Sequence, residues 1–151
     1  MKKKILSLMI FAFVLAACAK VPPLGKVGQK LEYKGYAMTV TAVEEAEDFP
    51  TTRKARTGYK LIAVEVLIES GGSNVTISPP HTKLVDGSKR DYTARTTGKE
   101  PLMAETYDIP KGQSQRGWIT YEVPKGVRVL TFVNTLPKEF DHAELAVRLS
   151  E

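Results

Sequence analysis

A strict alternation of side-chain types between Tyr59 and Glu69 is the strongest structural signal in this sequence. From Ile62 to Ile68 every second position is β-branched, and the positions between carry apolar or acidic side chains. A two-residue repeat with β-branched side chains on one face predicts a β-strand that is buried on that face. A Ser-Gly-Gly-Ser-Asn segment then ends the strand. The predicted buried face consists of Ile62, Val64, Val66 and Ile68.

The same repeat recurs along the chain, with turn residues between the repeats. No segment beyond residue 29 shows convincing helical periodicity. About eight short strands at a spacing of roughly 8–12 residues are typical of an all-β sandwich. Besides the strand described above, the predicted strands cover residues 36–43, 75–77, 83–85, 89–93, 103–107, 114–123, 128–134 and 143–149.

Some of these strands allow finer predictions. Met38 and Val40 share one face of the first strand, and Ala42 is a third candidate for that face. Asp86-Gly87 is expected to form a tight hairpin turn with positive φ at both positions. In the strand over 114–123, one face carries Ile119, Tyr121 and Val123 and the other carries Trp118, Thr120 and Glu122.

The first 17 residues are predicted to be a targeting signal that takes no part in the fold. Three lysines at positions 2–4 precede a mostly apolar run from Ile5 to Ala17. This run is too short for a permanent transmembrane helix, which needs about 20 residues. A positive start followed by a short apolar run is typical of a signal peptide. No later apolar run is long enough to span a membrane.

The end of this signal, Leu15-Ala16-Ala17-Cys18, resembles the lipobox that the lipoprotein signal peptidase cleaves. Small residues before the cleavage point fit a narrow protease site, and the cysteine thiol carries diacylglycerol. The resemblance implies cleavage before Cys18 and further acylation by acyltransferases, with fatty acids such as palmitate. The alternatives are an ordinary secretory signal cut after Ala17 or Ala19, and an uncleaved anchor.

Processing would change the charge of the chain. The whole sequence has 22 Lys and Arg against 17 Asp and Glu, and loss of the three signal lysines lowers the net charge from +5 to +2. This small excess gives no argument for a nucleic-acid partner. Cys18 is the only cysteine, so an intramolecular disulfide is impossible and stability must come from a packed core.

A short tether is expected between Cys18 and the folded domain. Residues 19–29 contain Pro22-Pro23 and two glycines. Eleven extended residues reach about 35 Å at most, so the domain should lie near the membrane surface. The predicted organisation is a signal peptide over 1–17, a lipidated cysteine with its tether over 18–29, and one β-sandwich domain over 30–151.

Four motifs occur in order along the predicted domain. They are a Tyr-x-x-Thr-Val strand at 36–40, the strand at 58–66, Leu-Val-Asp-Gly at 84–87, and Pro-Lys-Gly leading to Gly-Trp-Ile-Thr-Tyr-Glu-Val-Pro at 110–124. Over about residues 28–134 this order resembles the telokin-like, immunoglobulin-fold domains of many secreted bacterial lipoproteins. The resemblance implies an immunoglobulin-like antiparallel β-sandwich of about 7–8 strands. These motifs are structural, and most such proteins have no known function, so no catalytic residue is transferred.

The two histidines are the candidate ligands for a copper or zinc site. His81 and His142 lie 61 positions apart, and Cys18 is reserved for lipid, so no zinc-ligand spacing occurs. A copper or zinc site would require both histidines to meet in space with a carboxylate or a methionine. Exposed loop histidines beside Pro80 and Asp141 are the ordinary alternative. We predict no metal and no cofactor, and keep a metal- or small-ligand-binding accessory role as the alternative function.

Charged and aromatic side chains offer further candidate binding sites. An acidic run at 44–48 precedes a basic run at 53–56, and we expect solvated arms of one hairpin, pairing across Pro50, in preference to a calcium or lipid site. Residues 42–48 have helical propensity but continue the strand that begins at residue 36, so we expect an extended edge there, with a short helical turn as the alternative. Tyr92, Tyr107 and Trp118 are candidate contacts for a glycan or peptide, although such aromatics more often cover a sandwich core.

The sequence lacks the signatures of common enzyme chemistry. It contains no Ser-x-x-Lys motif, no complete nucleophile elbow and no glycine-rich phosphate loop. We therefore predict a protein that is not an enzyme. It would lie on the extracytoplasmic side of the cell membrane or outer membrane, and its loops or an exposed sheet edge would contact an envelope protein or a glycan.

Overall fold

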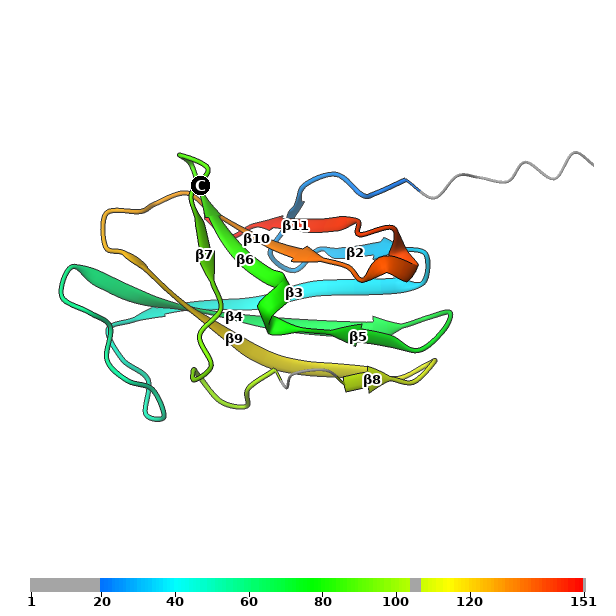
Figure 1. Cartoon of the computed structure of the whole chain (residues 1–151), viewed down its shortest axis with the longest axis horizontal. Helices are drawn as coiled ribbons and strands as arrows, with labels where there is room; N and C mark the ends of the chain where they lie inside the picture. Colours follow the sequence, from blue (N-terminus) through cyan, green and yellow to red (C-terminus); the bar gives the residue numbers. More distant parts are fainter. Residues whose placement is uncertain (1–19, 104–106, 151) are drawn as a thin grey trace, which may run out of the picture.

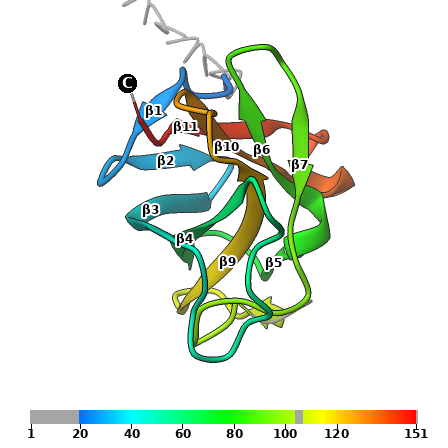
Figure 2. The ribbon, with the colours of Figure 1, turned by 90° about the vertical axis from the view of Figure 1, so that its left-hand side faces the viewer.

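The computed structural model describes residues 20–103 and 107–150. The lipobox residues Leu15, Ala16, Ala17 and Cys18 lie outside the described residues. Two β-sheets pack face to face, as the alternating strands predict, and Figures 1 and 2 show them as two layers. The predicted all-β sandwich, of immunoglobulin-like class, is therefore confirmed.

One layer is a four-stranded antiparallel sheet in the order β2-β3-β4-β9. The other is a five-stranded sheet in the order β1-β11-β10-β6-β7, and a short β5-β8 pair extends the sandwich. Two single-turn 3-10 helices, η1 (Pro79–His81) and η2 (Lys138–Phe140), lie in connections. The strands are β1 (Gly25–Lys26), β2 (Lys30–Tyr33), β3 (Tyr36–Ala46), β4 (Tyr59–Ser70), β5 (Val75–Ile77), β6 (Thr82–Asp86), β7 (Asp91–Thr93), β8 (Tyr107–Ile109), β9 (Ser114–Pro124), β10 (Leu130–Thr135) and β11 (Glu144–Arg148).

The main core lies between the two sheets, and the predicted buried face of β4 forms part of it. Ile62 is 3% exposed, and Val64, Val66 and Ile68 are fully buried. The predicted inner face of β9 is also confirmed, because Ile119, Tyr121 and Val123 belong to the same core. The ring of Tyr121 meets that of Phe132 edge to face, with centroids 6.3 Å apart.

Two predictions about local geometry were wrong. A β-bulge between Val40 and Ala42 shifts the register of β3 against β4, so Val43, and not Ala42, packs against the main core. A bulge inserts one residue and exchanges the two faces of the strand beyond it. In the β6–β7 turn the positive φ occurs at Lys89, at 63°, and not at Asp86 or Gly87.

The folded domain begins earlier than residue 30. Gly25 and Lys26 pair in parallel with Val147 and Arg148, so β1 lies within the stretch that the sequence suggests is a tether. The chain before β1 leaves the sandwich at the end that carries η2 and the β2–β3 turn, whereas the C-terminus lies at the opposite end (Figure 1).

Candidate functional site

A second apolar cluster lies on the outer face of the four-stranded sheet. It consists of Phe49, Leu61, Ala63 and Trp118, and the connections over 47–58 and 94–103 cover it. Trp118 is only 7% exposed, and the Lys99 ammonium lies 4.1 Å from its ring centroid in a cation–π contact. The predicted contact residue Trp118 therefore anchors two connections, and little of its ring remains for a ligand.

The connection over 94–103 lies directly on β9 because two glycines allow the approach. A Cβ atom on Gly117 would meet the backbone of Met103 at 2.6 Å, and one on Gly98 would meet the Thr120 hydroxyl at 2.2 Å. The backbone N–H of Met103 donates to the carbonyl of Trp118 at 2.9 Å. These contacts cover the middle of β9, which is an edge strand of the four-stranded sheet.

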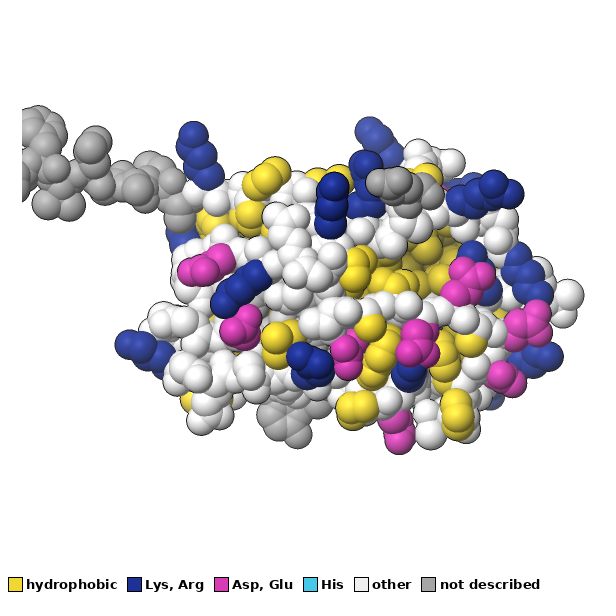
Figure 3. Space-filling model, turned by 180° about the vertical axis from the view of Figure 1, so that it is seen from behind, with side chains coloured by type: hydrophobic (Ala, Val, Ile, Leu, Met, Phe, Trp, Pro, Cys, Tyr) yellow, Lys and Arg dark blue, Asp and Glu magenta, His cyan; other side chains and the backbone are white. Residues whose placement is uncertain are grey.

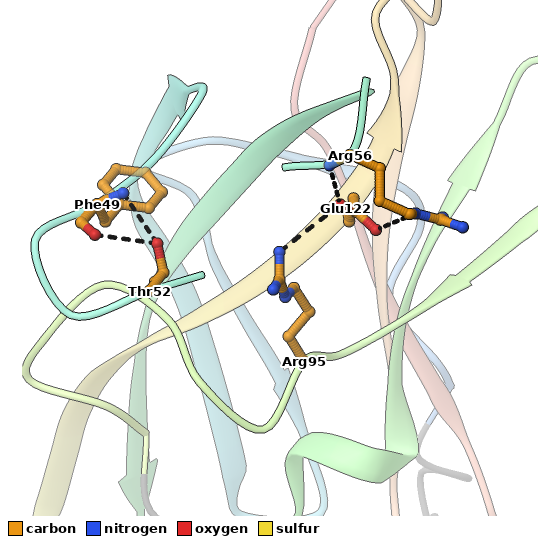
Figure 4. Close-up of polar contacts among 5 residues, drawn as sticks. All are labelled: Phe49, Thr52, Arg56, Arg95 and Glu122. Atoms are coloured by element: carbon orange, nitrogen blue, oxygen red, sulfur yellow. Dashed lines mark hydrogen bonds and ion pairs between the residues drawn. The ribbon is translucent and has the colours of Figure 1, made fainter. Parts of the chain in front are cut away.

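Glu122 lies near the C-terminal end of β9 and holds the connection over 47–58 in place (Figure 4). Its carboxylate accepts hydrogen bonds from the backbone N–H and the Nε of Arg56, at 2.8 and 2.9 Å. Arg95 approaches the same carboxylate with its NH1 at 3.8 Å. Partial burial acts in the opposite direction, but these contacts with Arg56 lower the pKa of Glu122 below its ordinary value. The cluster therefore holds two loops to one strand.

The acidic and basic runs pair mostly with other parts of the chain. One pair, Lys54 with Glu47 at 3.7 Å, joins the two arms across Pro50 as the sequence suggests. Two other acids of the run pair with residues outside it: Glu45 with Lys60 at 2.7 Å, and Glu44 with Lys99. Figure 3 shows acidic and basic side chains intermixed over the face behind that of Figure 1.

Two of the candidate aromatic contacts, Tyr92 and Trp118, lie on different sheets. Tyr92 is half-buried against the main core, and its hydroxyl donates to the carboxylate of Asp86 at 2.7 Å. Trp118 belongs to the outer cluster on the other sheet. The backbone of Tyr107 lies in β8, and its side chain lies outside what the structure describes.

The two histidines, by contrast, line one pocket of about 500 Å³. Strand register places Lys83, Thr93 and Thr135 on the outer face of the five-stranded sheet, because the alternating residue Leu84 is fully buried. η1 contributes His81, and the turn after η2 contributes His142. We call this hollow the histidine pocket; it is lined by Pro80, His81, Thr82, Lys83, Asp91, Thr93, Thr135, Leu136, Pro137, Lys138 and His142.

The turn that carries His142 has an unusual backbone. Asp141 and His142 have φ of 58° and 52°, in the left-handed region that non-glycine residues rarely adopt. The Asp141 carboxylate accepts hydrogen bonds from the Lys34 ammonium at 2.5 Å and from the Tyr33 hydroxyl at 3.2 Å. These bonds to β2 and its turn fix the position from which His142 lines the pocket.

The histidine pocket meets one requirement of a shared metal site. Two histidines that lie far apart in sequence both contribute to its lining. Within 20–103 and 107–150, however, no group of three His, Cys, Asp or Glu side chains is placed to hold a metal ion. In the same ranges, no helix is long and apolar enough to cross a membrane.

The architecture defines a two-layer β-sandwich domain. The chain belongs to the family described as Domain of unknown function (DUF4352), which matches residues 25–140. That boundary coincides with the first residue of β1. No curated protein sequence matches the chain.

Solved structures with a similar fold come from bacteria. The yjhA protein of Bacillus subtilis has a TM-score of 0.66 at 16% identity, over 84% of this chain and 100% of that one. The secreted protein MPT63 of Mycobacterium tuberculosis has a TM-score of 0.61 at 13% identity, over 86% of this chain and 98% of that one.

A third structure, ycdA of Bacillus subtilis, is described as a putative lipoprotein. Its TM-score is 0.65 at 11% identity, over 80% of this chain but only 38% of that one. At these identities the likeness establishes the shared β-sandwich fold and nothing finer.

Proposed function

We propose that this protein is a bacterial lipoprotein, held at the extracytoplasmic face of the cell membrane or outer membrane by lipid on Cys18. Its β-sandwich would serve as a non-enzymatic binding domain. The observation that carries the proposal is the Leu-Ala-Ala-Cys motif at 15–18, directly after a charged and apolar signal and only seven residues before β1. A single acyl chain anchors only marginally, so stable attachment requires the multiple acylation that the motif implies.

The fold supports this proposal by analogy. Proteins of similar fold include MPT63, described as secreted, and ycdA, described as a lipoprotein candidate. The immunoglobulin-like sandwich also agrees with the resemblance to telokin-like lipoprotein domains. Such scaffolds commonly bind partners through loops or a sheet edge.

The position of β1 sharpens the expected geometry at the membrane. Only residues 19–24 separate Cys18 from the first paired residue, and six residues reach about 20 Å when extended. The end of the sandwich with η2 and the β2–β3 turn would face the membrane. The turns over 47–58, 86–90 and 124–129 would face away from it and form the accessible surface for a macromolecular partner.

The test is intact mass spectrometry of protein extracted from its native membranes. The wild type and a matched control, Ser73→Ala in an exposed loop, should both yield residues 18–151 with diacylglycerol and an additional acyl chain. Cys18→Ser should lose the lipid and leave the membrane fraction. An unmodified wild-type product that starts after Ala17 or Ala19 would overturn the proposal.

A small-ligand-binding accessory role is the second candidate function. The specific observation that favours it is the histidine pocket, where side chains from η1, β6, β7 and the turn after η2 converge.

A further inference from the structure

The lining of the histidine pocket divides into a polar part and an apolar part. The polar part has two ammonium groups, two imidazoles and one carboxylate, which belong to Lys83, Lys138, His81, His142 and Asp91. The apolar part consists of Pro80, Leu136 and Pro137, of which Leu136 is almost fully buried and forms a fixed floor. A pocket with both parts suits a ligand that carries a charge on an apolar body.

The polar groups of the pocket have unused capacity to donate hydrogen bonds. Thr82 is occupied, because its hydroxyl bonds the Pro79 carbonyl and the Tyr121 hydroxyl. Lys83 is held by Asp91 at 3.0 Å, which leaves the other protons of its ammonium free. Within the described part of the chain, no intramolecular bond engages the Lys138 ammonium or the side chain of either histidine. The free groups are therefore mostly donors.

The net charge of the pocket lining favours an anionic ligand over a cationic one. Two lysines against Asp91 leave an excess of one positive charge, before any proton on the imidazoles is counted. A divalent cation would meet this excess and would find only two histidines and a carboxylate already bonded to Lys83. An anion would find several donors and no second carboxylate in the lining.

We propose that the histidine pocket binds a small organic anion, with a carboxylate held by Lys83, Lys138 and the two histidines and an apolar body against Leu136, Pro137 and Pro80. The inference rests on the non-enzymatic binding role proposed above, but not on the lipid anchor. Fumarate-sized to benzoate-sized molecules fit a hollow of about 500 Å³.

The charged groups that face the two histidines are Lys83 and Asp91 of the sheet, Glu144 of β11 beside Lys83, Lys138 of η2, and Asp141 beside His142.

The experiment is a titration of the histidine ring signals by NMR, with benzoate as the probe. His81 and His142 are the only histidines, so the variants His81→Gln and His142→Gln assign both signals. Benzoate should shift both, whereas benzamide, which has the same ring but no charge, should shift them far less.

A matched pair of lysine variants tests the polar part. Lys138→Gln should weaken benzoate binding about threefold, the size expected for one exposed charge. Lys26→Gln, an exposed lysine on β1 outside the pocket, should leave it unchanged. The protein is used in whichever form the mass measurement identifies, lipidated in detergent or soluble, so failure of the anchor and failure of the pocket are distinguished.

Three outcomes would overturn the proposal. The first is the absence of any shift up to about 50 mM benzoate, far above the ~1 mM dissociation constant of an ordinary weak ligand. The second is equal binding of benzoate and benzamide, which would show an apolar site alone. The third is saturable binding of Zn²⁺, seen as a shift of both histidine ring signals, when benzoate shifts neither signal.

Discussion

The side-chain amide of Asn134 donates a hydrogen bond to the hydroxyl of Tyr36 over 3.0 Å, and so joins β10 of one sheet to β3 of the other. Both residues are buried, at 2% and 0% exposure. Burial raises the pKa of the Tyr36 hydroxyl well above its ordinary value. The bond fixes the relative position of the two layers.

Removal of this acceptor should destabilise the domain. Tyr36→Phe leaves the buried amide of Asn134 with only the weak Met38 sulfur at 3.7 Å, and we expect a loss of about 1–3 kcal/mol in the free energy of unfolding. Urea denaturation measures it. Tyr59→Phe is the control, since this half-buried tyrosine lies outside the core, and its loss should stay within about 0.5 kcal/mol. Equal losses would contradict this role of the hydroxyl.

Trp118 should control the stability of the connection over 47–58. Trp118→Ala removes the centre of the outer cluster, and we expect a loss of about 3–5 kcal/mol. Limited trypsin digestion should then cut faster after Arg53 and Lys54, which are exposed in that connection. Val129→Ala, an exposed apolar residue elsewhere, should change neither the stability nor the cleavage rate. Protection of Arg53 and Lys54 in Trp118→Ala would show that the connection is held by other contacts.

The absence of a side chain at Gly117 should contribute to the stability of the domain as much as a buried side chain does. Gly117→Ala places a Cβ against the Met103 backbone, and we expect about 2 kcal/mol of destabilisation as 102–103 moves away from β9. Gly126→Ala is the matched control, because its Cβ would have no heavy atom within 4 Å and its φ is not positive. Thermal unfolding of both variants measures the difference, and a tolerated Gly117→Ala would mean that 102–103 adjusts without cost.

Asp86 should make stability depend on pH at the acidic end. Its carboxylate accepts hydrogen bonds from the Arg90 backbone N–H, the Tyr92 hydroxyl and the Ser88 backbone N–H. These bonds lower the pKa of Asp86 below its ordinary value, and the bond from Arg90 has the largest effect. A carboxyl whose pKa is lower in the folded state stabilises the fold above its unfolded value of about 4 and loses that contribution as the pH falls further.

The variant Asp86→Asn tests this dependence. The wild type should be more stable than the variant at neutral pH, and the difference should shrink as the pH is lowered below about 4. Urea midpoints at neutral pH and near pH 3 measure it. Asp48→Asn, an exposed acid in the 47–58 connection, should differ little from the wild type at either pH. A difference for Asp86→Asn that stays constant with pH would show that only the shape of the side chain matters.

Local patterns predicted much of the fold. The β-branched face of β4 and the limits of β5 follow from the residues alone, because a half-buried strand imposes a repeat of two. The bulge after Val40 could not be predicted, since it depends on pairing with β4. The short β1 carries no pattern, because two residues are too few to show one.

The candidate sites were harder to predict, because they depend on contacts across the chain. Nothing near His81 signals that His142 will line the same pocket, and only the packing of η1 beside the turn after η2 brings them together. An aromatic side chain such as that of Trp118 is typical of binding sites, but the connections over 47–58 and 94–103 cover it. A sequence pattern reports which face a residue occupies, and not whether a distant loop covers that face.

The placement of β1 has a mechanical consequence. A partner held at the turns over 47–58 and 124–129 and a lipid on Cys18 would pull on opposite ends of the sandwich, along the direction of its strands. Because β1 runs parallel to β11, this tension would slide Gly25 and Lys26 along their neighbours instead of peeling them away. Hydrogen bonds loaded in shear break together and resist force better than bonds opened one after another. The attachment point would therefore suit a domain that remains folded while its partner moves relative to the membrane.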